Sequence, residues 1–324
     1  MKILTVIVLA AALCGNAFGW GCEGHQIVAL IASQHLTPEA RTAVYQLLKD
    51  NPIDPSLARF CQPVATEPMA DNSTWADDAK RGEKTGTWHY LDIPRGGEHA
   101  ELMKYCEAIG ESKDGKDRPG CLLTAMQYEM EILKDRSRPA AERATALRYM
   151  IHFVGDLHQP LHTTTNDDQG GNCTTVTLFE DPKKANLHGV WDYGIIGHYL
   201  KEKNETPAQM AQDLDKRFQG KGRRWMRGSL DFGGWILEGH QVAEKVTYDK
   251  LTPRLPAAAV ENAPGCAAER EKTTALKIDI DKKYADRAMP VIERQLAKAG
   301  YRLAEVLNFA FPASEEPNRN TSRE

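Results

Sequence analysis

The chain has no excess of positive charge. Its 324 residues include 41 lysines and arginines against 45 aspartates and glutamates, which gives a formal net charge of −4. This balance excludes the strongly basic surface with which many proteins hold nucleic acid by neutralising its phosphates. If the substrate is anionic, bound cations must attract it locally.

Long apolar runs are also scarce. The one at residues 3–13 follows Lys2 and precedes Ala17-Phe-Gly19, and this is the pattern of a secretory signal that is cleaved before Trp20. No later stretch approaches the ~20 apolar residues that a membrane-spanning helix needs. We therefore expect a signal peptide at 1–19, no membrane span, and a monomeric product that is secreted or periplasmic.

The cysteines lack the C-x-x-C spacing of zinc and redox sites. Of the seven cysteines, Cys14 leaves with the signal, and an even set in an exported chain predicts up to three disulfides. Cys106 and Cys121 form the most local candidate pair, although spacing alone does not fix the pairing. Any metal ligands must then be histidines and carboxylates. The remaining cysteines are Cys22, Cys61, Cys106, Cys121, Cys173 and Cys266.

Most of the chain has the apolar periodicity of helices. β-branched alternation at 170–179 predicts half of a small hairpin, whereas 87–94 should be extended and 50–70 and 95–120 should be loops. With no internal repeat and no sharp linker, we expect one mainly α domain at 20–309 and a solvated tail at 310–324. Helices are predicted at 25–35, from Thr37, from Trp75, and at 121–135, 139–159, 206–218, 230–246 and 279–309, with helical spacing also at 186–193.

One helix concentrates metal-binding side chains where a core helix should be apolar. His152 and Asp156 stand four residues apart, so on a helix they project from one face and can hold one ion or two adjacent ions. Pro160 disfavours helical geometry at Gln159, which should end the helix and bring His162 back over the same pocket.

A second pair with the same spacing is His188 and Asp192, while Asp77 and His89 each closely follow a tryptophan. A single pair of this kind is weak evidence, because chance supplies many. Two pairs together with His162 and His25 are hard to explain as core packing. Mixed nitrogen and oxygen ligands without thiolate suit zinc better than calcium or magnesium.

These motifs resemble the S1/P1 nuclease family, secreted tri-zinc enzymes that share a helical fold with bacterial zinc phospholipase C. The resemblance runs from Trp20 to about Asn308 and is specific in spacing and in order. It is carried by Trp20-Gly-x-x-Gly-His25, Trp75-Ala-Asp77, Trp88-His89-Tyr90-x-Asp92, His152-Phe-x-Gly-Asp156-x-x-Gln-Pro-Leu-His162, Gly170-Gly-Asn172 and Asn186-Leu-His188-x-x-Trp-Asp192.

The resemblance implies a fold, a ligand set and a cofactor. The fold would be the single-domain helical fold of that family with a small β-hairpin, and the cofactor would be three zinc ions, with Asp156 bridging two of them. The first ion would be held by Asp77, His89, His152 and Asp156, the second by His162, His188 and Asp192, and the third by His25, Asp156 and the free amine and carbonyl of Trp20.

The resemblance also implies the reaction. Single-stranded DNA or RNA would be cut to products that end in 5′-phosphate, with 3′-nucleotides as further substrates, by zinc-activated hydroxide attacking phosphorus while zinc stabilises the departing 3′ oxygen. Asp77 would orient the hydroxide, and Lys80, where the family usually has arginine, would help to neutralise the phosphoryl oxygens. Tyr90 and Asp92 would contact a nucleobase, and Asn172 would also bind substrate.

Two rival hypotheses remain. In the zinc phospholipase C branch the first histidine lies further from the N-terminal tryptophan and the second paired motif ends in glutamate, whereas this chain has His25 and Asp192. The other rival is a non-catalytic exported zinc-binding protein on the same scaffold. A purely structural site would not need open coordination positions, which argues against that rival.

Overall fold

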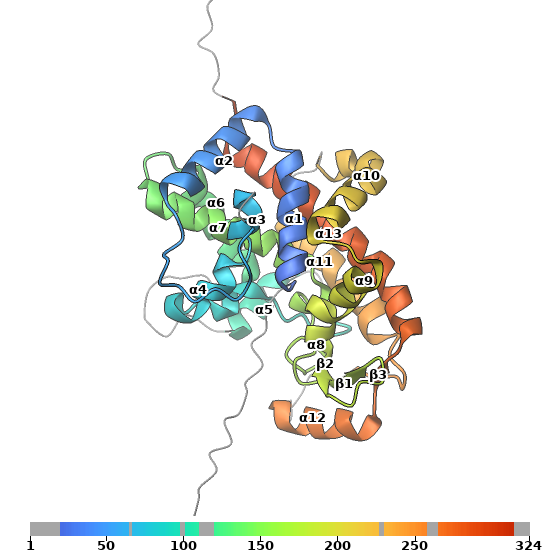
Figure 1. Ribbon diagram of the computed structural model, residues 1–324. Coiled ribbons are helices and arrows are strands. Elements are labelled where there is room, and N and C mark those ends of the chain that lie inside the picture. Colours follow the sequence, from blue (N-terminus) through green and yellow to red (C-terminus); the bar gives the residue numbers. More distant parts are fainter. Residues whose placement is uncertain are drawn as a thin grey trace, which may run out of the picture.

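The computed structural model describes residues 20–64, 67–97, 101–109, 120–226, 230–257 and 265–313. The expected signal peptide and residues 314–324 of the expected tail lie outside this part of the chain. Within it the protein is mainly α-helical, as predicted (Figure 1). The helices are α1 Cys22–Gln34, α2 Pro38–Asp50, α3 Pro68–Asn72, α4 Trp75–Glu83, α5 Leu102–Ile109, α6 Leu122–Lys134, α7 Ala140–Asp156, α8 Leu187–Gly189, α9 Ile195–Lys203, α10 Pro207–Trp225, α11 Phe232–Val242, α12 Gly265–Leu276 and α13 Lys282–Ala310.

Short tight or widened turns connect several of these helices. η1 Gly86–His89 and η2 Pro160–His162 are 3-10 turns. η3 Val190–Gly194 and η4 Ala243–Tyr248 are π-helical segments that continue α8 and α11. Such π-helical insertions are frequent at functional sites.

Helix α1 lies at the centre of the molecule, against α13 and α10, while α6 pairs with α7 (Figure 1). The contact between α1 and α13 is close at Gly300, where a Cβ atom would lie 2.5 Å from Cβ of Ile31. The fully buried rings of Trp20, Trp191 and Tyr301 belong to the same continuous core. This core forms a rigid base for the side chains carried by α1 and α7.

Local sequence signals set several of the helix ends. The Thr37 hydroxyl caps α2 by accepting the Ala40 amide at 3.2 Å, with Pro38 in the first helical position. Helix α7 ends at Asp156, three residues before the predicted end, because the chain tightens into turns there. Gln159 is extended, with ψ at 115°, as the following proline requires.

The predicted hairpin is present and has a third strand. β1 Thr175–Leu178 pairs antiparallel with β2 Ala185–Asn186 and parallel with β3 Asp279–Ile280. Figure 1 shows this sheet together with α12 at one end of the molecule. The helix predicted from residue 279 therefore begins only at Lys282, after the strand.

Other sequence predictions need correction. The segment 87–94 begins as the turn η1 and is extended only from Tyr90. Helix α3 lies at the end of the expected loop 50–70, where the Glu67 carboxylate accepts the Ala70 amide and Pro68 starts the helix. Helix α5 lies in the expected loop 95–120, and α12 was not predicted. The last helix reaches Ala310 and Phe311 is buried, so ordered structure extends past the expected start of the tail.

The predicted disulfides are present, including the local pair. Cys22 bonds to Cys61, Cys106 to Cys121, and Cys173 to Cys266. Among the helices described, none is both long and apolar enough to cross a bilayer.

The close contact at Gly300 leads to a stability prediction. Gly300→Ala should lower the free energy of unfolding by about 1–3 kcal/mol, because the new methyl group forces α1 and α13 apart. The matched control is Gly220→Ala in α10, where a Cβ atom meets nothing within 4 Å. It should raise stability by up to ~1 kcal/mol, because alanine favours the helix. Thermal and urea unfolding of the metal-loaded protein measure both changes. If Gly300→Ala were as stabilising as the control, the close helix contact would be contradicted.

Candidate metal centre

Helix α7 carries two neighbouring side chains into the interior. His152 and Asp156 are one helical turn apart, project from the same face and are fully buried. Gly155 leaves room beside them for a third ring, because a Cβ atom there would lie 2.7 Å from Nδ1 of His25. The His25 and His152 rings stack with centroids 3.9 Å apart. The glycine before Asp156 is therefore required by the approach of α1.

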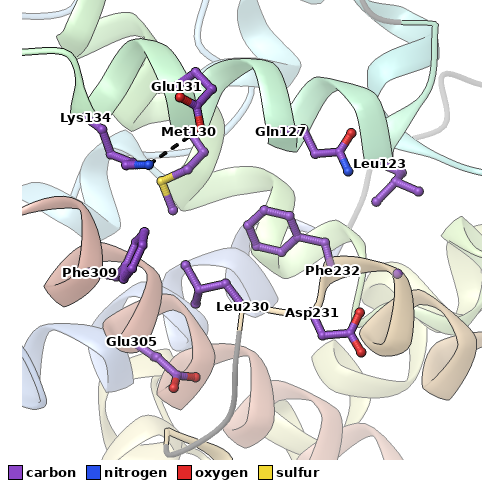
Figure 2. Close-up of a pocket in the computed structure, with 11 residues that line it drawn as sticks. Leu123, Gln127, Met130, Glu131, Lys134, Leu230, Asp231, Phe232, Glu305 and Phe309 are labelled. Atoms are coloured by element: carbon purple, nitrogen blue, oxygen red, sulfur yellow. Dashed lines mark ion pairs between the residues drawn. The ribbon is translucent and has the colours of Figure 1, made fainter.

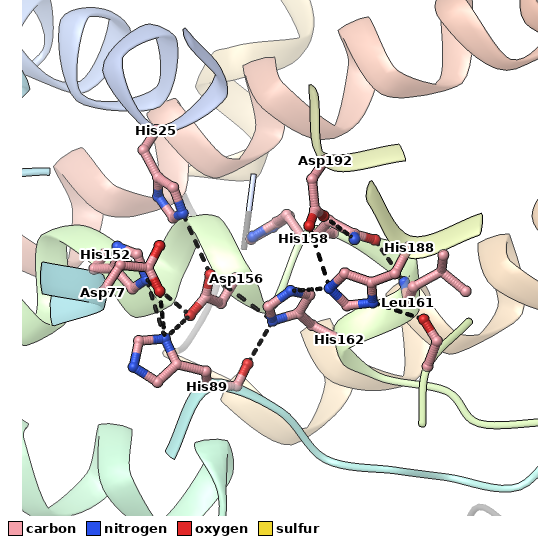
Figure 3. Close-up of polar contacts among 12 residues, drawn as sticks. His25, Asp77, His89, His152, Asp156, His158, Leu161, His162, His188 and Asp192 are labelled. Atoms are coloured by element: carbon pink, nitrogen blue, oxygen red, sulfur yellow. Dashed lines mark hydrogen bonds and ion pairs between the residues drawn. The ribbon is translucent and has the colours of Figure 1, made fainter. Parts of the chain in front are cut away.

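Segments far apart in the sequence bring the other predicted side chains to the same place (Figure 3). α4 carries Asp77, the turn η1 ends at His89, η2 ends at His162, and the continuous segment α8 and η3 carries His188 and Asp192. In Figure 3 Asp156 lies near the middle, between His25, Asp77, His89 and His152 on one side and His162, His188 and Asp192 on the other.

Three groups of these side chains could each hold a metal ion. Within each group the candidate ligand atoms lie within 4.8 Å of one another, and every member is buried. His152 belongs to two of the groups, so these two share a side chain. The groups are His25, His152 and Asp156; Asp77, His89 and His152; and His162, His188 and Asp192.

Asp156 faces two sets of histidines with its two oxygens. Oδ2 lies 3.0 Å from Nδ1 of His89 and 3.2 Å from Nε2 of His152. Oδ1 lies 3.4 Å from Nε2 of His25 and 3.8 Å from Nδ1 of His162. One carboxylate can thus contact cations on both of its sides.

Backbone carbonyls orient three of the rings. Nδ1 of His152 lies 2.7 Å from the Ser73 carbonyl, and Nδ1 of His188 lies 2.6 Å from the Gly170 carbonyl. Nδ1 of His162 lies 2.6 Å from the carbonyl of His89. A carbonyl only accepts, so each Nδ1 donates, and in the neutral ring Nε2 keeps its lone pair for a metal.

The resulting lone pairs face one another. Nε2 of His162 and Nε2 of His188 are 3.1 Å apart, and Oδ2 of Asp192 lies 3.3 Å from the latter. Two acceptors at this distance repel unless a proton or a metal ion lies between them. Both nitrogens of His25, Nε2 of His89 and Oδ1 of Asp156 are buried without a hydrogen-bond partner in the described structure. Because such atoms are costly to bury unsatisfied, the donor set fits a cation, and its nitrogen and oxygen composition fits zinc.

The electrostatic environment favours the metal-binding protonation state at His25 and Asp156 but not at His152. Burial, together with the neighbouring His152, lowers the pKa of His25 to about 4, so that ring is neutral at pH 7. Burial opposes ionisation of Asp156, but His152 and His162 hold the pKa of its carboxyl well below the ordinary value. Burial would likewise lower the pKa of His152, yet Asp156 and Asp77 raise it to about 9. Metal binding at His152 must therefore displace a proton.

The predicted ligand Trp20 is the first residue described and is fully buried. Its side chain packs against Gly24, where a Cβ atom would lie 2.6 Å from Cβ of Trp20. The next amide, of Gly21, donates to the Asp192 carbonyl at 2.9 Å. Trp20 and Gly21 thus lie beside the segment that carries the candidate ligand Asp192.

The other predicted residues lie around the centre. Nζ of Lys80 lies 3.1 Å from Oδ1 of Asp77, so the lysine is paired with a candidate ligand. Tyr90 directly follows His89 and is half-buried. Burial and the nearby Asp168 raise the pKa of Asp92 to about 7. Asn172 lines a pocket together with His188 and Asp192.

Sequence reasoning missed the residues that support these ligands. The Gln159 amide donates to Oδ1 of Asp192, and its own oxygen accepts the Leu161 amide at 2.6 Å. The carbonyls of Ser73 and Gly170 hold two rings. Only Gln159 had a sequence signal, its place in the motif before Pro160, because a carbonyl partner depends on long-range folding.

A helical fold that buries three histidine and aspartate groups, two of which share His152, is typical of a metal-dependent class of protein. The S1/P1 nuclease family model matches residues 20–312. Nuclease S1 of Aspergillus oryzae is 27% identical over 95% of this chain and 97% of its own length. Endonuclease 4 of Arabidopsis thaliana is 29% identical over 94% of this chain and 93% of its own length. Nuclease P1 of Penicillium citrinum is 26% identical over 89% of this chain and 97% of its own length. The chain therefore belongs to the S1/P1 nuclease family and is a nuclease of that type.

The close approach at Gly155 yields a prediction for metal binding. Gly155→Ala should displace the His25 ring and remove about one metal ion per chain, because the added methyl group would lie 2.7 Å from Nδ1 of His25. Metal per chain, measured by atomic emission, and helix content, measured by circular dichroism, test this. The control Gly82→Ala, in a helix that also carries a candidate ligand but with nothing within 4 Å, should keep its metal. Full metal content in Gly155→Ala would contradict the role of His25.

Proposed function

We propose that the chain is an exported enzyme that uses zinc to hydrolyse single-stranded DNA and RNA to products ending in 5′-phosphate, and that it also accepts 3′-nucleotides. The observation that carries the proposal is the set of three buried histidine and aspartate groups in a chain that belongs to a nuclease family. One zinc ion in each group would give three per chain.

The proposed ligands are those that the family resemblance implies. Asp77, His89, His152 and Asp156 would hold one ion, and His162, His188 and Asp192 a second. Supporting observations are the short distances from Asp156 to His89 and His152 and the facing lone pairs of His162 and His188. The third ion would take His25, the second oxygen of Asp156, and the amine and carbonyl of Trp20, which requires that cleavage before Trp20 frees the amine.

Bound zinc would supply an activated water with a pKa of about 7, and positive charge for the phosphate and the leaving oxygen. The protein's own residues would position these partners. Asp156 would hold two sites at a fixed separation, and Asp77 would orient the attacking group while Lys80 fixes Asp77 through their 3.1 Å contact. The same ammonium group would lend charge to the phosphoryl oxygens.

Tyr90 and Asp92 are the proposed contacts to a nucleobase. Tyr90 follows the candidate ligand His89 directly, so a base stacked on its ring would place the adjoining phosphate near the centre. With a pKa raised to about 7 by burial and by Asp168, the Asp92 carboxyl is available both as donor and as acceptor near neutral pH. Asn172 lies in the pocket beside His188 and Asp192. It is proposed to contact the substrate on the side of the metal centre opposite to Tyr90.

Export, either as a secreted or as a periplasmic protein, is part of the proposal. Three disulfides and the lack of a membrane-crossing helix among the described residues support it, because disulfides persist in oxidising compartments. A monomer is proposed.

The match to the nuclease family favours nuclease activity over the two alternatives, a phospholipase C and a non-catalytic zinc-binding protein.

A direct test uses the purified mature protein. It should hydrolyse single-stranded oligonucleotides to 5′-phosphate products, lose activity on exhaustive chelation and regain it with zinc, because the proposed nucleophile depends on the metal. End-labelled substrates and zinc analysis measure this, with a 3′-nucleotide and phosphatidylcholine assayed alongside. Products ending in 3′-phosphate would contradict the leaving group, and hydrolysis of phosphatidylcholine alone would favour the phospholipase alternative.

The two faces of Asp156 lead to a graded prediction. Asp156→Asn should reduce activity and zinc content more than Asp192→Asn, because Asp156 contacts histidines from two groups through separate oxygens, whereas Asp192 is a member of one group. Both substitutions keep the size of the side chain and remove one charge, so each serves as the control for the other. Equal losses of activity at equal zinc content would argue against a bridging carboxylate.

A further inference from the structure

A pocket of about 470 Å³ opens beside the metal centre, and its lining includes Phe60, Asn172, His188, Asp192 and Tyr193. We propose that Phe60 and Tyr193 form a second base-stacking subsite, which receives the nucleobase on the far side of the cleaved phosphate from Tyr90. This inference rests on the proposed function, because the subsite would serve the same reaction.

Tyr193 is positioned by two glycines. It follows the candidate ligand Asp192 on the π-helical segment η3, and the residue is 52% exposed. A Cβ atom at Gly189 would lie 2.8 Å from the Tyr193 hydroxyl, and a Cβ atom at Gly21 would lie 2.8 Å from Cβ of Tyr193. The backbone at these glycines thus makes room for the tyrosine to lie across the rim of the pocket.

Phe60 is positioned by a buried carboxylate and by a disulfide. The Phe60 amide donates to Oδ1 of Asp78 at 2.7 Å, and Nε of Arg59 donates to Oδ2 at 3.1 Å. The adjacent Cys61 is bonded to Cys22 on α1. Phe60 is therefore tied to α4 and α1, the helices that carry the candidate ligands Asp77 and His25, while the residue stays 49% exposed.

The chemistry of the lining favours a base over a phosphate. No lysine or arginine is among the residues that line this pocket in the described structure, whereas Glu23 is, so away from the candidate metal ligands the lining offers a phosphate no cationic side chain. Aromatic faces and the amide groups of Asn172 and Asn186 suit a flat, polar-edged ring. Base stacking on aromatic side chains is the usual way in which proteins hold single strands.

The pocket also lies on the appropriate side of the centre. Its inner wall is formed by His188 and Asp192, whereas Tyr90 follows His89, and Figure 3 places His89 and His188 on opposite sides of Asp156. A strand with one base at Tyr90 and the next between Phe60 and Tyr193 would span the metal centre. A 3′-mononucleotide would fill only one of these subsites.

The test removes a ring from the enzyme and a base from the substrate. Dithymidine phosphate is compared with two analogues, each carrying an abasic sugar on one side of the phosphate. Tyr193→Ala and Phe60→Ala should each lower kcat/KM for dithymidine phosphate about 5- to 150-fold, the range expected for losing one base-stacking contact. The loss should arise mainly in KM. It should be much smaller for the abasic analogue that lacks the base held by this subsite, because that analogue has no stacking contact to lose there. Tyr90→Ala should show the opposite analogue dependence.

Further variants separate stacking from structural damage. Tyr193→Phe and Tyr193→Trp should retain most of the affinity, because each keeps a ring. The control is Phe309→Ala, which removes the ring of a residue that is 54% exposed in a different pocket, between α6 and α13 (Figure 2). It should leave kcat/KM for all three substrates unchanged. Zinc content and circular dichroism confirm that each variant is intact.

Calorimetric binding of phosphorothioate-linked dithymidine to the zinc-loaded protein gives a readout without turnover. Weaker binding by Tyr193→Ala than by the unmodified protein supports the subsite even if no nucleic acid is cleaved, in which case only the proposed function fails. Unchanged binding, or the same fold-loss of kcat/KM on all three substrates, would overturn the subsite.

Discussion

The buried carboxylate of Asp156 is the group on which the rest of the structure depends. Removing a charge from water is expensive unless an opposite charge lies close to it, and histidines from four different segments, α1, η1, α7 and η2, surround this carboxylate. Oδ2 lies within 3.2 Å of Nε2 of His152, and Oδ1 lies 3.4 Å from Nε2 of His25. Helix α7 supplies the rigid support, and Gly155 allows α1 to approach. Although the carboxylate is a member of one candidate group, its two oxygens also face His89 and His162, which belong to the other two groups.

Irregular backbone segments around this carboxylate orient the histidine rings. Gly170 has φ at +59°, a conformation that suits glycine, and a Cβ atom there would lie 2.3 Å from the Leu161 carbonyl. The carbonyl of Gly170 accepts a hydrogen bond from Nδ1 of His188. Second contacts of this kind fix the tautomer and orientation of metal-binding histidines. The turns that interrupt the helical fold are thus as necessary to the site as the helices are.

Much of this arrangement could be predicted from the sequence, because local spacing encodes it. His152 and Asp156 share a helix face, and Pro160 turns the chain so that His162 returns. The carbonyl partners and the parallel pairing of β3 could not be predicted, since each depends on segments that meet only in the folded chain. Helix α5 was missed because its surroundings are rich in glycine, lysine and aspartate. The sequence predicts an extended segment at His89 rather than the turn, because 3-10 turns have no periodic signal over so few residues.

Adjacent residues contribute to different parts of the site: one belongs to the metal centre and the next to the rim of the neighbouring pocket. On α4 Asp77 faces the histidines, whereas the next residue, Asp78, holds the backbone of Phe60. On α8 and η3 Asp192 belongs to a candidate ligand group, whereas Tyr193 lies at the rim of the pocket. The chain is acidic overall, and Lys80 is already paired with Asp77. Under the proposed function, attraction of a phosphate must then come mainly from bound metal, while the aromatic rim supplies affinity that does not depend on charge. Catalysis and phosphate binding would therefore both depend on zinc. Base stacking would be the part of substrate recognition that does not depend on the metal.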